Sequence, residues 1–107
     1  MIGGNNIKTK FKMNKPEIKL LNKGNALKIL EVTGNANVLM PKHTSSEEAT
    51  IIVLKGGAII DFGGSEHLLK TGDSLLIPAK QVHSLLVMTK LKALVVMPSE
   101  SLIEFTN

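Results

Sequence analysis

Apolar residues recur along this chain in short runs, and glycine, asparagine, aspartate and proline interrupt them every 8–12 residues or so, the spacing of about one strand in a sandwich or barrel. Long runs with helical periodicity are missing, so the pattern leaves room for at most one short helical turn, near residues 16–22, PEIKLLN. We therefore predict an all-β protein with strands near residues 7–13, 26–33, 36–41, 50–55, 57–62, 66–70, 74–78, 82–89, 92–97 and 101–105.

The turns between these runs are marked by residues that favour chain reversal. Gly34-Asn35 separates two strands, and Gly63-Gly64-Ser65 and Thr71-Gly72-Asp73 mark further turns. Gly56-Gly57 permits a tight reversal or a bulge, because glycine adopts positive φ at little cost. We predict that Thr89-Lys90-Leu91 joins the last long hairpin.

Many strands and few aromatic residues favour a closed or double-sheet β structure, in which one face of each strand lines the interior. Two histidines would then face a largely apolar cavity. Three sets of alternating residues would share such inward faces: His83, Leu85 and Val87; Leu39, Pro41 and His43; and Ala49, Ile51 and Val53. The third histidine, His67, alternates with Leu69 and is expected at the surface or in sheet packing.

The length of 107 residues fits one domain, with no linker or low-complexity tract. We divide residues 1–107 into an N-terminal strand or arm (1–25), a barrel core (26–98) and a C-terminal strand (99–107). The absence of cysteine excludes disulfides and a thiolate nucleophile, and no Ser-His-Asp arrangement is evident. Without a long apolar run or an apolar leader, we expect a cytoplasmic protein with no membrane association.

The basic residues are all lysines, and seven of the 13 lie in residues 1–28 against a single acid, Glu17. Lysines 8, 10 and 12 alternate with apolar positions, which is typical of the solvent face of an edge strand. Arginine, tyrosine and tryptophan are absent, so the chain lacks the bidentate base contacts and the best stacking side chains. We therefore do not expect a nucleic-acid partner.

A spaced set of residues then defines a resemblance. Gly72 is followed by five residues and Pro78, and His83 comes five residues after that proline. This spacing resembles the second motif of the cupin superfamily, in particular small single-domain members of the conserved-barrel, RmlC-like type. Lys80 stands where the motif has its second glycine, and Val87 stands where it has asparagine.

The first cupin motif is matched less completely. With its final glycine at Gly56, its first histidine falls on His43, its second histidine on Ser45 and its glutamate on Ala49. Its leading glycine falls on Asn37. The resemblance implies a double-stranded β-helix, or jelly-roll barrel, and a homodimer that pairs through the N-terminal strand.

Cupin metal sites usually take three histidines and one glutamate, and only His43 and His83 stand at those positions. Glu48 could join them if a bulge shifts its strand by one residue. We expect a small organic ligand in an apolar pocket without a complete metal site; whether the chain is an enzyme stays open, with binding favoured. The alternative is a metal-dependent dioxygenase, isomerase or decarboxylase that holds Zn, Fe, Mn or Ni on His43, His83 and Glu48. The expected pocket residues are His43, His83, Ser45, Ile51, Val53, Leu85 and Val87.

Overall fold

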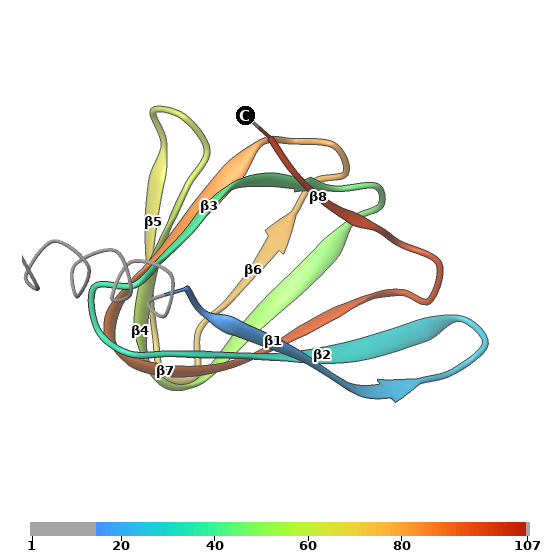
Figure 1. The fold of residues 1–107 in the computed structure, drawn as a ribbon, viewed down its shortest axis with the longest axis horizontal. Helices are drawn as coiled ribbons and strands as arrows, with labels where there is room; N and C mark the ends of the chain where they lie inside the picture. Colours follow the sequence, from blue (N-terminus) through green and yellow to red (C-terminus); the bar gives the residue numbers. More distant parts are fainter. Residues whose placement is uncertain (1–14, 107) are drawn as a thin grey trace, which may run out of the picture.

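The computed structural model describes residues 15–106, which consist of strands and the turns that join them (Figure 1). The segment near residues 16–22, where a short helical turn was considered, forms a strand instead. The strand predicted at 7–13 lies outside the described residues. Within the described residues there is no helix long and apolar enough to cross a membrane. The strands are β1 Glu17–Lys23, β2 Leu27–Gly34, β3 Leu39–Ser45, β4 Ala49–Asp61, β5 Glu66–Lys70, β6 Ser74–Ile77, β7 His83–Pro98 and β8 Ile103–Phe105.

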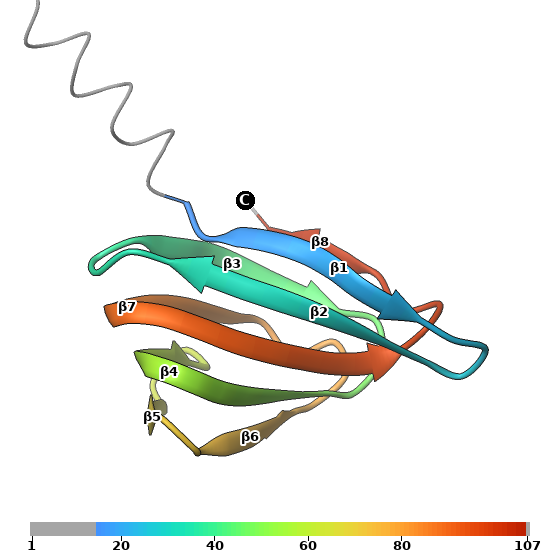
Figure 2. The ribbon, with the colours of Figure 1, turned by 90° about the horizontal axis from the view of Figure 1, so that it is seen from below.

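The long antiparallel strands β4 and β7 form the centre of the fold. On its other edge, β7 pairs with β2 through residues 91–98 and with β3 near its start. Likewise, β6 pairs with the start of β4 and β5 with its end. Two layers result, in the orders β1-β2-β7-β4-β6 and β8-β3-β7-β4-β5, with β4 and β7 passing through both. Figure 2 shows β7 between β2 and β4, and Figure 1 shows β2 and β3 on opposite sides of the interior.

The passage from one layer to the other depends on a bend at Gly56. The pairing of β4 with β7 shifts register on both sides of this residue, as a bulge does. Gly56 has a φ of 85°, and a Cβ atom there would overlap the carbonyl oxygen of Lys90. Glycine is therefore required both by the backbone conformation and by the close approach of β7.

The bend also corrects two predictions. Residues 50–55 and 57–62 were expected as separate strands, as were 82–89 and 92–97, but each pair lies in one continuous strand, β4 or β7. Thr89-Lys90-Leu91 is part of the bend of β7 and joins no hairpin. The residues that bend a strand are of the same types as those that end one, so the pattern did not separate the two cases.

The predicted turns at Gly34-Asn35, Gly63-Gly64-Ser65 and Thr71-Gly72-Asp73 are confirmed. Gly63, Gly64 and Gly72 all have positive φ. Between the two layers lies an aliphatic core, whose largest fully buried side chains include Ile51, Val53, Ile60 and Val87. Removing such side chains from water stabilises the fold by about 1.5–3 kcal/mol each.

Candidate functional site

Two histidines from different strands meet inside the barrel. His43 of β3 and His83 of β7 are register partners, and their ring centroids are 4.2 Å apart with planes inclined by 61°. Both side chains are buried, at 6% and 5% of their full exposure. The sequence predicted that both would face the interior, and the pairing of β3 with β7 places them in direct contact.

A bulge in β3 brings His43 to the inner face. Met40 pairs with Leu85 and His43 with His83, so β3 has one residue more than β7 over this stretch. Pro41 lies in the bulge, where the ladder does not require the N–H that proline lacks. Met40 is therefore buried together with His43, whereas Leu39 is 49% exposed. The expectation that Leu39 shares the inward face of His43 was wrong, because the bulge changes the alternation.

Each imidazole is oriented by a backbone carbonyl two residues earlier in the chain. His43 Nδ1 lies 2.6 Å from the Pro41 oxygen, and His83 Nδ1 lies 2.9 Å from the Gln81 oxygen. A carbonyl oxygen only accepts, so each Nδ1 must carry the proton and donate it. In the neutral rings both Nε2 atoms are then acceptors, and within residues 15–106 neither has a hydrogen-bond partner.

The surroundings keep both rings neutral. Burial lowers the pKa of His43 below 6.5, and the neighbouring His83 lowers it further, although the hydrogen bond to Pro41 opposes the shift. Burial likewise lowers the pKa of His83, and its bond to Gln81 opposes this. At neutral pH the site therefore presents two uncharged acceptors side by side.

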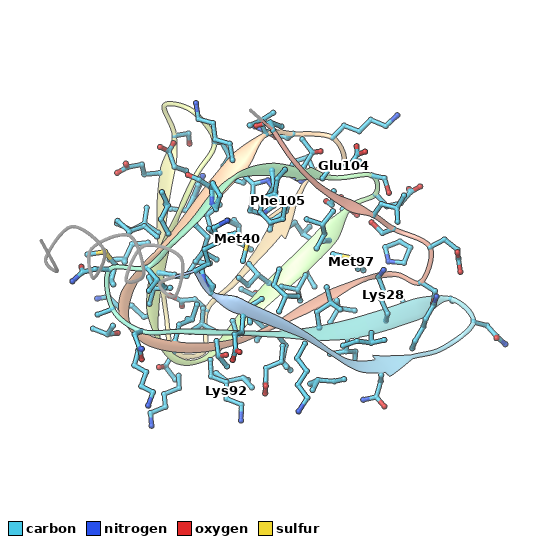
Figure 3. All side chains as sticks on the ribbon, in the orientation of Figure 1. Lys28, Met40, Lys92, Met97, Glu104 and Phe105 are labelled. Carbon is cyan, nitrogen blue, oxygen red and sulfur yellow. The ribbon has the colours of Figure 1, made fainter. Side chains whose placement is uncertain are left out.

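The histidines border a cavity of about 40 Å³ between the layers. A water molecule needs roughly 10–15 Å³ of such volume, so there is room for only a few waters. The lining is aliphatic apart from Ser45 and the histidines, and Met40 and Met97 lie in the space between the layers (Figure 3). A second hollow of about 210 Å³ shares Ile18 and Met40 with the cavity and is also lined by Lys15, Pro16, Pro41 and Phe105.

The structure separates the predicted pocket residues into two groups. Ser45, Ile51 and Leu85 line the cavity together with the histidines. Val53 and Val87 are buried in the aliphatic core and do not line it. Alternation along a strand indicates which side chains point inward, but it does not indicate how far along the strand the cavity extends.

Two aromatic side chains that the sequence reading did not place in the site flank the imidazoles. The ring centroid of Phe105 is 5.3 Å from that of His43, and the centroid of Phe62 is 5.8 Å from that of His83. Phe105, on β8, is the register partner of His43. The sequence predicted a final strand but not its pairing with β3, and the contact with His43 depends on that pairing. His67 lies on β5, outside the lining, with Nε2 3.2 Å from Ser65 Oγ.

The side chains around the two imidazoles determine whether the site can hold a metal. Residues 15–106 contain no group of three or more His, Cys, Asp or Glu side chains that could hold an ion, and residues 1–14 contain none of these types. Glu48 is exposed, and the hydroxyl of Ser45 donates to the Glu47 carbonyl at 2.9 Å. Two neutral Nε2 atoms suit a metal, but zinc and non-haem iron sites generally have three protein ligands. The residues therefore do not form a complete metal site.

Two facing layers that share bent central strands, with a polar pair in the interior, define a double-stranded β-helix barrel. The chain belongs to the Cupin domain family, whose sequence pattern matches residues 30–97, more than half of the chain. This result confirms the resemblance predicted from the motif around His83.

Solved structures give the same fold. An RmlC-like cupin from Desulfovibrio desulfuricans is 24% identical, with a TM-score of 0.73 over 83% of this chain and 87% of that one. The DMSP lyase DddQ from Ruegeria pomeroyi is 21% identical, with a TM-score of 0.78 over 88% of this chain and 53% of the lyase. KdgF from Halomonas sp. is 15% identical, with a TM-score of 0.71 over 79% and 81%. At these identities the likeness shows the fold alone, and no curated protein matches the chain.

Proposed function

We propose that this protein binds a small organic molecule whose hydrogen-bond donor enters the cavity beside His43 and His83 and whose apolar body lies in the adjoining hollow of about 210 Å³. The observation that supports this most strongly is the pair of Nδ1-to-carbonyl bonds, which makes both Nε2 atoms acceptors in an apolar lining. Apolar pockets with a few convergent polar groups are the usual form of small-molecule sites.

Hydrogen-bond energetics indicate what the ligand must supply. Within residues 15–106 no buried side-chain nitrogen or oxygen lacks a partner, so each unpaired Nε2 is open to water. A donor on the ligand would replace that water with a hydrogen bond worth about 0.5–1.5 kcal/mol. The apolar body would displace water from the hollow that shares Ile18 and Met40 with the cavity and that is also lined by Phe105. A carboxylate would bring only acceptors to two neutral acceptors, so hydroxyl or N–H compounds fit better.

Phenol and toluene form a matched pair of probes, because they differ chiefly in the donor. Binding to the full chain is measured by calorimetry and by NMR shift changes. We expect phenol to bind about five- to tenfold more tightly than toluene, as one hydrogen bond of about 1 kcal/mol requires.

Replacing one histidine at a time shows where the preference arises. His83→Phe keeps a ring but removes one of the two acceptors, so the preference for phenol should shrink. It should disappear in the His43→Phe/His83→Phe double variant. His67→Phe is the control, since His67 lies outside the cavity lining. Equal affinity of the two probes for the unmodified protein, or an equal loss in the control, would contradict the proposal.

The alternative is a metal-dependent cupin enzyme of the dioxygenase, isomerase or decarboxylase type. The contact between the two imidazoles favours it, because their Nε2 atoms are both free to bind an ion. Metal analysis of tag-free protein purified without chelators separates the two functions. About one atom per chain, lost in both His43→Phe and His83→Phe, would replace the binding proposal by this one.

We also propose a homodimer that forms through the N-terminal arm, residues 1–25. All of β1 is exposed, including Ile18 at 40% and Leu20 at 53%, and among the described strands β1 pairs only with β2. An open edge with apolar side chains is a template for pairing with another chain. Light scattering during size exclusion should give twice the chain mass; a monomer at micromolar concentration would contradict this.

A further inference from the structure

A groove at the bend of the barrel gathers lysines. Its volume is about 410 Å³, and its lining includes Lys15, Lys55, Lys90 and Lys92. No residue lines both this groove and the histidine cavity. The groove is therefore a separate feature that the proposed function does not use.

The sheet register places two of these lysines directly opposite each other. Lys92 of β7 is the partner of Lys55 of β4 on one side and of Thr33 of β2 on the other. Partners in register point to the same face, and Lys92 points away from the interior in Figure 3. Like charges directly opposite each other destabilise a sheet, so this pair lowers the stability of the fold.

Few carboxylates compensate for this charge. Lys92 lies 3.6 Å from the Glu31 carboxylate, while within residues 15–106 the lysines at 15, 55 and 90 form no ion pair. Glu17 is the single acid in the lining. Residues 1–14, which precede Lys15, contain three more lysines and no aspartate or glutamate. Among residues 15–106, the lining and the ion pairs therefore place only Glu17 and Glu31 beside these four lysines.

We propose that this groove binds a small anion with two or more negative charges, of the phosphate-ester or pyrophosphate class. Ammonium groups bind phosphate oxygens as point charges, and the Thr33 hydroxyl and Asn35 amide in the lining supply further donors. A volume of about 410 Å³ suits a small molecule. The lining contains neither arginine nor an aromatic ring, so it lacks the groups that stack bases or grip nucleic acid.

Pyrophosphate is the probe, added to the full chain at constant ionic strength with sodium chloride as the reference. We expect saturable binding by calorimetry and a rise in Tm, because a ligand that binds only the folded state stabilises it. In Lys55→Gln/Lys92→Gln, the affinity should fall about tenfold or more. The Tm without ligand should change little, because the loss of the like-charged pair and the loss of the Lys92–Glu31 ion pair have opposite effects.

The matched control is Lys23→Gln/Lys70→Gln, which removes the same charge from exposed residues outside the groove. It should keep pyrophosphate affinity within about twofold of the unmodified chain. His83→Phe should also leave the pyrophosphate affinity unchanged. The proposal for the groove and the proposal for the histidine cavity are therefore tested separately.

Three results would overturn the proposal. The first is no binding of pyrophosphate beyond the effect of sodium chloride at matched ionic strength. The second is an equal loss of affinity in the groove and control variants. The third is binding only of a long single-stranded oligonucleotide, with an affinity that falls steeply with salt, since this is the behaviour of nonspecific polyanion binding.

Discussion

The histidine cavity and the lysine groove differ in how far their ionisable side chains are exposed to solvent. In the cavity, burial lowers the pKa of His43 and His83, so the ionisable groups are neutral and act as acceptors. In the groove, Lys55 and Lys92 are exposed to solvent, and Lys92 lies beside the Glu31 carboxylate. The difference shows that burial alone is enough to lower the pKa of an imidazole inside this small barrel, while the lysines are kept at its surface.

The bend at Gly56 joins the two halves of β4 and lies against the bend of β7, the strand that carries both His83 and Lys92, so breaking it should have the largest effect. In Gly56→Ala, the new Cβ would meet the Lys90 carbonyl and hold an unfavourable positive φ. We expect the free energy of unfolding to fall by about 3 kcal/mol or more, measured by urea denaturation. Gly63→Ala has a similar φ but open space around it, so it should cost only about 1–2 kcal/mol. Equal losses in the two variants would contradict the role given to the bend.

A cavity-lining substitution should separate the two regions. Ile51 is 1% exposed and lines the cavity, so Ile51→Ala should lower the free energy of unfolding by about 2–5 kcal/mol. The enlarged cavity should bind toluene more tightly, while pyrophosphate affinity at a temperature where the variant is folded should not change. A parallel loss of pyrophosphate binding would show that the two regions are not independent.

The two cavity histidines should make the stability of the protein depend on pH. Because the folded-state pKa of His43 and His83 lies below 6.5, the unfolded chain binds protons more readily, and stability should fall as pH drops through 6.5 toward the lowered pKa. Denaturation midpoints between pH 7.5 and 5 measure this. The His43→Phe/His83→Phe double variant should show a flatter profile, and an unchanged slope would contradict the assignment.

The smallest effect is expected from a single neutralisation in the groove. Lys55→Gln removes one member of the pair opposite Lys92, so the free energy of unfolding should rise by about 0.2–1 kcal/mol at low salt. The gain should shrink at high salt, because exposed charges are screened. Urea midpoints at two salt concentrations test this, and a loss of stability at low salt would argue against repulsion between the two lysines.

Local residue types explain how much of the fold the sequence predicted. Turns at Gly34-Asn35 and Gly63-Gly64-Ser65 have strong local signals, and the spacing from Gly72 to His83 indicated the family. The continuity of β4 and β7 was not predictable, because it depends on pairing between distant residues, which does not alter local composition.

The candidate site was predictable in part for a related reason. Both histidines were expected to face the interior, and they do. The inward turn of Met40 depends on the bulge at Pro41, and the contact of Phe105 with His43 depends on the pairing of β8 with β3. Such register information arises only when the sheet forms.

The central claim is that His43 and His83 are neutral at neutral pH and present Nε2 as acceptors to the cavity. Nitrogen-15 NMR of the imidazoles distinguishes the two neutral tautomers and the imidazolium form, with His67 as the internal comparison. We predict that at pH 7.5 both cavity rings carry their proton on Nδ1, and that phenol perturbs their Nε2 signals. A proton on Nε2 of either ring, or an imidazolium at this pH, would contradict it.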